Sequence, residues 1–192
     1  MLNVLEWEGE KGSMNLIFLY GPPAVGKLTI GKALSEKIGL PLLDNHTLLN
    51  PIAKLFGWDH PERKRLGDSM RIELFAAAAK AGKSFITTFG GGGDSYDSFI
   101  QQVKKTVVEN GGEVRFIHLT APESVLFERV LQDSRTVHSK MTSVETLKKK
   151  LADYPDVTAC ALVGPHLEID TSLCSVEEIV EKIRKELNLT QQ

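Results

Sequence analysis

The sequence predicts a three-layer α/β domain built on a parallel β-sheet. Short apolar runs typical of buried strands alternate along the chain with longer segments that have helical apolar spacing. Between the first strand and the first helix lies a glycine-rich loop, residues 21–29, which reads Gly-Pro-Pro-Ala-Val-Gly-Lys-Leu-Thr. Parallel strands joined by helices need right-handed crossovers, so we expect helices on both faces of the sheet.

The composition is that of one globular domain. The 192 residues are 42% hydrophobic and 25% charged, which excludes a disordered or fibrous chain. A net charge of −2 argues against binding nucleic acid through bulk charge. Neither a membrane-length apolar run nor a signal pattern is present, so we expect a cytoplasmic protein without a membrane partner. We also expect a monomer or weak dimer. Cys160 and Cys174 lack C-x-x-C spacing and are expected to be reduced thiols.

The loop fits the pattern G-x-x-x-x-G-K in the context that makes it specific. The apolar run 16–20 precedes it, and residues 28–37 have helical spacing. Glycines let the backbone curl so that its N–H groups point at phosphate oxygens, at the positive end of the next helix. We therefore expect these residues to bind ATP: Gly21, Pro22, Pro23, Ala24, Val25, Gly26, Lys27, Leu28 and Thr29. The alternative is a glycine turn without a ligand.

One position departs from the pattern. The residue after Lys27 is usually Ser or Thr, whose hydroxyl binds Mg²⁺, but here it is Leu28. The hydroxyl comes one residue later, at Thr29, where it is expected to reach the α-phosphate. Mg²⁺ would then be held by other groups or through water, because it keeps several water ligands in most sites.

Polar residues follow the short second strand, residues 41–44. Asp44, Asn45 and His46 would lie at the carboxyl edge of the sheet, where ligands bind in open α/β folds. Asp44 could hold Mg²⁺ through water or orient an attacking hydroxyl, and His46 could contact the substrate. Alternatively, Asp44 or Asn45 caps a helix that begins near Thr47.

A helical insertion, about residues 46–82, is predicted to cover the substrate. It holds a short helix over 48–56, a loop over 57–61 and a long helix over about 62–81. Arg71 is the expected anion contact, because a guanidinium can hold a carboxylate or phosphate by two parallel bonds. Arg63 and Arg65 are equally compatible with a solvated helix face.

Four glycines follow the third strand, residues 84–89. Ordering them is entropically costly, so a close approach of substrate to Gly90, Gly91 and Gly92 is the functional interpretation, and a loose linker is the alternative. In proteins with a phosphate-binding loop of this type, an acidic residue usually ends this strand, and here that residue is missing.

The rest of the chain repeats the pattern. We expect a helix over about 96–109, a strand over 114–119 and a helix from Pro122 through Val130. A basic, polar stretch at about 132–143 is predicted to be a lid that folds over phosphates, with Arg129 and Arg135 neutralising their charge; a hydrated loop is the alternative. A helix over 145–154, a strand over 166–170 and a helix over 176–187 follow.

Two further expectations concern the final helix and the beginning of the chain. Ser175 and Glu178 fit a capping box at the final helix. Residues 1–13 precede the first strand without resembling its start, and Met14 is a second methionine. We therefore expect 1–13 to be an N-terminal extension, or a misassigned start, ahead of a single domain over 14–192.

From residue 14 to 187 the chain resembles the P-loop small-molecule and nucleotide kinases, with shikimate kinases and nucleoside-monophosphate kinases nearest. The resemblance rests on the loop 21–29, Asp44, Arg71-x-Glu73, the glycines from Gly90, Arg129, Arg135 and Ile169-Asp170-Thr171-Ser172. It implies a sheet order of 2-3-1-4-5, with Thr171 and Ser172 near the adenine. Shikimate kinases carry a second aspartate where this chain has His46.

The resemblance implies transfer of the γ-phosphoryl group of ATP-Mg²⁺ to a small acceptor. Lys27, Asp44 and Arg135 would act on the reacting groups, while His46, Arg71 and Gly90 to Gly92 would face the acceptor. Two alternatives remain open. One is a nucleoside-monophosphate kinase, which the basic inserted helix favours. The other is a regulatory nucleotide-binding protein without transfer, which Leu28 favours.

Overall fold

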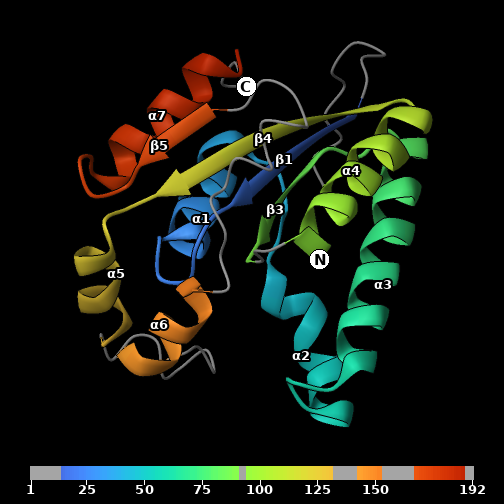
Figure 1. The fold of residues 1–192 in the computed structure, drawn as a ribbon. Coiled ribbons are helices and arrows are strands. Elements are labelled where there is room, and N and C mark those ends of the chain that lie inside the picture. Colours follow the sequence, from blue (N-terminus) through green and yellow to red (C-terminus); the bar gives the residue numbers. More distant parts are fainter. Residues whose placement is uncertain (1–13, 91–93, 132–141, 153–166, 189–192) are drawn as a thin grey trace, which may run out of the picture.

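The computed structural model describes residues 14–90, 94–131, 142–152 and 167–188. Its centre is a five-stranded, fully parallel sheet in the order β2-β3-β1-β4-β5 (Figure 1). The strands are β1 Met14–Tyr20, β2 Leu42–Leu43, β3 Phe85–Phe89, β4 Gly112–Thr120 and β5 Leu167–Asp170. The fold class and the strand order predicted from the sequence are confirmed.

Helices connect the strands in the described part of the chain. They are α1 Lys27–Ile38, α2 Asn45–Phe56, α3 Pro61–Lys80, α4 Asp94–Glu109, α5 Glu123–Val130, α6 Val144–Ala152 and α7 Val176–Glu186. None of the helices in these described segments is long and apolar enough to cross a membrane.

Two hydrophobic clusters sandwich the sheet and create the three layers. On one face, α3 and α4 cover β1 (Figure 1). Phe75 of α3 and Val103 of α4 belong to the same buried cluster as Phe18 of β1. On the other face, α1 and α7 contribute Leu34 and Ile183, which join Leu19 of β1 in one cluster (Figure 1). The side chains of β1 are buried on both faces, as expected for the central strand of a parallel sheet.

Local sequence signals mark several helix ends. Gly39 ends α1 in a left-handed conformation with φ 73°, and Ser175 and Glu178 form the predicted capping box of α7. α2 begins at Asn45, three residues before the predicted start, because Asp44 caps it. Pro122 is the N-cap residue of α5 and so stands one position ahead of the first turn predicted for it.

Some predicted features lie outside the described residues. These are the extension over 1–13, Gly91 and Gly92, and most of the predicted lid, including Arg135. The segment predicted as an insertion, 46–82, holds α3 and all of α2 except its first residue, and the two helices pack against each other (Figure 1).

Candidate active site

The glycine-rich loop joins β1 to α1 as the motif predicts. Gly26 is the N-cap residue of α1 with φ 102°, and Lys27 is the first residue of the helix. The Lys27 ammonium donates to the carbonyl oxygens of Gly21 at 2.8 Å and Pro22 at 2.7 Å. The lysine is therefore held over the loop, where it can exchange carbonyl oxygens for phosphate oxygens.

Asp44 caps α2, which is the structural alternative raised by the sequence. Its Oδ1 accepts from the His46 amide at 2.8 Å, and its Oδ2 accepts from the Thr47 hydroxyl at 2.5 Å. Burial opposes ionisation of this carboxyl, but the hydrogen bonds from Thr47 and His46 outweigh it and hold the pKa of Asp44 below its usual range. Asp44 is therefore an anion at neutral pH, with part of its hydrogen-bonding capacity already used by the helix.

Arg71 is buried at the junction of α2, α3 and β3, with 3% of its surface exposed. One guanidinium nitrogen lies 3.3 Å from Asp68 Oδ1, and the other donates to the Asn45 side-chain oxygen. The guanidinium carbon lies 5.5 Å from the centre of the Phe89 ring. The backbone amide of Asn45 donates to Thr88 Oγ1 at 3.0 Å, which fixes the start of α2 against β3.

A narrow pocket surrounds this arginine. Its walls come from α2, α3 and the end of β3: Asn45, Leu49, Arg63, Lys64, Asp68, Arg71, Phe89 and Gly90. Asp68 is the single carboxylate of this lining and also pairs with Lys64 at 2.8 Å. Three cationic side chains against one carboxylate leave the pocket positively charged, so it favours an anionic group.

Gly90 connects the pocket to the phosphate loop. A Cβ at this residue would lie 3.7 Å from both Cε and Nζ of Lys27, and Gly90 also lines the pocket around Arg71. Gly90 therefore lies between the lysine and the cationic pocket, and both are next to its backbone. Gly90 is the described member of the predicted glycine contact.

Arg129, Thr171 and Val25 form a hydrogen-bonded group at the back of the loop. Arg129 donates to Thr171 Oγ1 and to the Thr171 carbonyl, both at 2.8 Å. Ser172 is held next to it, because its hydroxyl and amide donate to Asp170 Oδ1 at 2.6 and 2.8 Å. These two bonds, helped by the charge of Arg129, hold the pKa of Asp170 below its usual range. The predicted contacts of Arg129, Thr171 and Ser172 with ATP stay predictions.

The structure thus brings together Lys27, Gly90, Asn45 and Arg71. His46 instead packs against Trp58, with ring centres 5.8 Å apart. The sequence analysis missed Asp68 and Phe89 as partners of Arg71. The spacing of Lys64, Asp68 and Arg71 places them on one side of a helix and could have indicated the first of these.

His118 is buried near the carboxyl end of β4. Its ring stacks on Tyr20, with centres 4.8 Å apart, and its Nδ1 lies 3.1 Å from Glu168 Oε2. Tyr20 and His118 are partners in the β1–β4 register. His118 therefore packs beside the last residue of β1, which precedes the phosphate loop.

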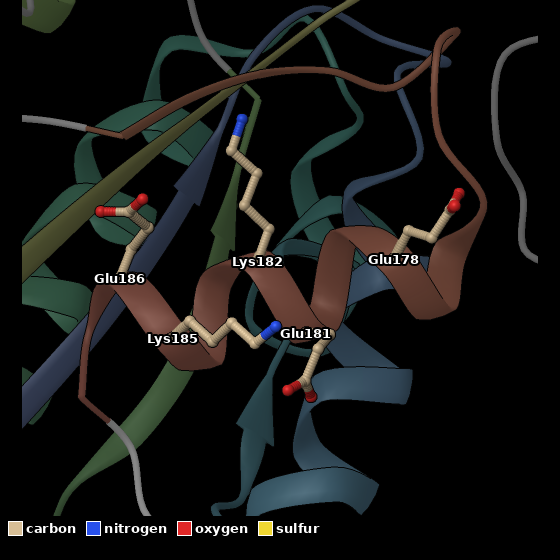
Figure 2. Close-up of a pocket in the computed structure, with 5 residues that line it drawn as sticks. All are labelled: Glu178, Glu181, Lys182, Lys185 and Glu186. Atoms are coloured by element: carbon tan, nitrogen blue, oxygen red, sulfur yellow. The ribbon is translucent and has the colours of Figure 1, made fainter.

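A shallow hollow along α7 is a surface feature of that helix alone. Figure 2 shows the side chains that line it, Glu178, Glu181, Lys182, Lys185 and Glu186, spread along the helix without converging on a point. Glu181 is paired with Arg184 at 2.7 Å. We assign the hollow along α7 no binding role.

The residues present fit a water-mediated rather than a direct contact with Mg²⁺. Leu28 offers no ligand, and among the described residues no group of three or more His, Cys, Asp or Glu side chains converges on a metal position. Asp44 retains lone pairs that could accept from a water of the hydrated ion. When bound, the ion would supply positive charge to the phosphate oxygens.

Some known kinases are similar to this chain in sequence and in fold. No protein-family model matches the chain. Shikimate kinase 2 of Yersinia enterocolitica is 29% identical over 145 residues, which cover 71% of this chain and 75% of the relative. The chain is similar to P-loop small-molecule kinases, and its distant homologues include proteins named shikimate kinase 2. A second relative, shikimate kinase 2 of Yersinia pseudotuberculosis, is 25% identical over 187 residues, which cover 89% of this chain and 97% of the relative.

Solved structures show the same fold for this P-loop kinase-like chain. Shikimate kinase from Acinetobacter baumannii, in complex with shikimate, matches with a TM-score of 0.64 at 20% identity and covers 93% of this chain and 96% of its own. A gluconokinase from Sinorhizobium meliloti matches with a TM-score of 0.63 at 16% identity, over 92% and 97% of the two chains.

Proposed function

We propose that this chain transfers the γ-phosphoryl group of ATP to a hydroxyl group of a small acceptor that carries a carboxylate or phosphate. The observation that supports this most is the position of Gly90 between Lys27 and the cationic pocket around Arg71. An acceptor held by its anionic group in that pocket would have its remaining groups next to the lysine. The similarity to small-molecule kinases supports the same reaction.

The loop amides and Lys27 would hold the β- and γ-phosphates. Lys27 would leave the Gly21 and Pro22 carbonyls and bind the phosphate oxygens, whose charge grows as the bond to the leaving ADP breaks. The acceptor oxygen forms the new P–O bond and loses its proton to Asp44 or to water. Positioning by Arg71 and the loop supplies most of the acceleration.

The test is ADP release from ATP-Mg²⁺ against a panel of hydroxylated acids, neutral sugars, aminoglycoside-like compounds and nucleoside monophosphates. An acid should stimulate release, and a neutral sugar of similar size should not. Stimulation by a nucleoside monophosphate would instead identify the second candidate, a nucleotide kinase, which the cluster of Arg63, Lys64 and Arg71 favours. Stimulation by neutral sugars alone would contradict the anionic acceptor.

Arg71→Lys is expected to raise the KM of the acceptor by about 10- to 100-fold with a smaller effect on kcat. The lysine keeps the charge but cannot make two parallel bonds to an oxyanion, and a lost charged hydrogen bond costs about 1.5–3 kcal/mol. Steady-state kinetics at saturating ATP measure the effect. Arg65→Lys is the matched control, because Arg65 is exposed and pairs with Glu62 at 2.6 Å. Equal KM values for Arg71→Lys and wild type would exclude Arg71 as the acceptor contact.

Substitutions of Asp44 separate its capping role from a catalytic one. Asp44→Ala removes the cap and should lower the free energy of unfolding by about 1 kcal/mol at pH 7. Asp44→Asn keeps a capping oxygen and should recover most of that stability, but should lose transfer activity if the carboxylate contacts hydrated Mg²⁺ or the acceptor. Full activity of Asp44→Asn would exclude a catalytic role for the carboxylate and leave Asp44 only as the cap of α2.

The same variants predict a pH dependence of stability. The pKa of Asp44 is lowered on folding, so its ionised form stabilises the protein above the unfolded value near 3.8, and this contribution is lost as the pH falls through the lowered folded value. The difference in unfolding free energy between wild type and Asp44→Asn should therefore shrink below that pH in urea titrations.

A further inference from the structure

The Val25 carbonyl at the back of the phosphate loop is bound by a residue 146 positions away. Thr171 Oγ1 lies 3.0 Å from this oxygen, in a buried hydrogen bond. Arg129 Nη1 also reaches it, at 3.5 Å. The loop is therefore attached to the segment that follows β5, and through Arg129 to the end of α5.

Thr171 is itself held rigidly. It is 5% exposed, its amide donates to the Thr120 carbonyl at 2.8 Å, and Arg129 donates to both its hydroxyl and its carbonyl oxygen. The hydroxyl carries one proton, and Thr120 O also lies within reach at 3.1 Å. The Val25 carbonyl oxygen is the nearer of the two acceptors, at 3.0 Å against 3.1 Å, and we assign the hydroxyl proton to it.

The peptide bond carries this anchorage to the other side of the loop. The Val25 carbonyl and the Gly26 N–H belong to one peptide unit, and the described chain contains no cis peptide bond. In a planar trans unit the C=O and N–H point in opposite directions. Holding the carbonyl against Thr171 therefore turns the Gly26 N–H away from Thr171, and donation to the carbonyl also polarises that N–H.

We propose that Thr171 is a positioning residue for nucleotide binding, which anchors the Val25–Gly26 peptide so that the Gly26 amide faces the phosphates. Arg129 acts with it by fixing the Thr171 hydroxyl. This inference rests on the proposed binding of ATP by the loop. Thr171 and Arg129 would act by orienting the loop and not by contacting the phosphates. The affinity for ATP is higher because the Gly26 amide is oriented before ATP binds.

Thr171→Val tests this directly, since it removes the hydroxyl and keeps the shape. We expect the Kd and KM of ATP to rise about tenfold, as for loss of one hydrogen bond, while the acceptor KM changes little. Thr171→Ser keeps the hydroxyl and should restore ATP binding to within about twofold of wild type. Calorimetric titration of ATP and steady-state kinetics, well below each variant's Tm, give both values.

Thr87→Val is the matched control. Thr87 is 2% exposed, and its hydroxyl donates to the Leu43 carbonyl at 2.8 Å, so the change deletes a buried hydroxyl bond between strands away from the loop. It should lower Tm without changing the Kd of ATP. An unchanged Kd in Thr171→Val, no rescue by Ser, or an equal loss in Thr87→Val would overturn the positioning role. A wild-type protein that binds no ATP would overturn the proposed function and this inference together.

Discussion

Lys27→Ala is expected to lower phosphoryl transfer by on the order of 10²- to 10³-fold or more, since even one neutral donor at a developing charge contributes that much. The Lys27 ammonium lies over the loop carbonyls and beside Gly90. Its removal deletes the full positive charge nearest the transferred group. ADP release at saturating acceptor measures the loss.

The Lys27→Ala protein should still fold. The side chain makes hydrogen bonds to two carbonyls of its own loop, and the core beneath the loop does not depend on its charge. Lys32→Ala is the matched control, because Lys32 is an exposed lysine of the same helix and should be dispensable. Full activity of a folded Lys27→Ala protein would exclude the loop as the ATP site.

Gly21→Ala is expected to have the largest effect on stability, at least about 3 kcal/mol or complete failure to fold. A Cβ at Gly21 would lie 2.2 Å from the Leu119 carbonyl oxygen, and φ at this residue is 145°. Both the backbone conformation and the contact with β4 exclude a side chain. Urea unfolding followed by circular dichroism gives the free-energy change.

Gly39→Ala separates these two causes. Gly39 also has a positive φ, 73°, but a Cβ there would meet nothing within 4 Å. It should cost only the conformational penalty, about 1 kcal/mol. Similar losses for the two variants would mean that the loop can move away from β4, in contrast to the packing described.

The sequence predicted features that depend on neighbouring residues. The apolar run before Gly21 predicted β1, and the spacing of Ser175 and Glu178 predicted the cap of α7. Asp44 shows how a local signal can carry two meanings. A carboxylate at a strand end suits both a ligand site and a helix cap, and the hydrogen bonds of Asp44 show that the cap is present.

Contacts between distant segments could not be predicted. The bond between Thr171 and Val25 depends on where β5 ends relative to the loop, and the stacking of His118 on Tyr20 depends on the register of β1 and β4. Neither has a signature in the spacing of residues. The chemistry of a guanidinium singled out Arg71, but its hydrogen bond to the Asn45 side chain depends on how α2 and α3 pack together.

The most direct test of the central claim is transfer of label from γ-labelled ATP to the acceptor that stimulates ADP release. We predict that label appears in the acceptor in a one-to-one ratio with ADP, and that Lys27→Ala abolishes both. ATP that binds tightly without any label reaching an acceptor would contradict a kinase. That result would favour a regulatory nucleotide-binding protein, with Leu28 as the residue that departs from the active pattern.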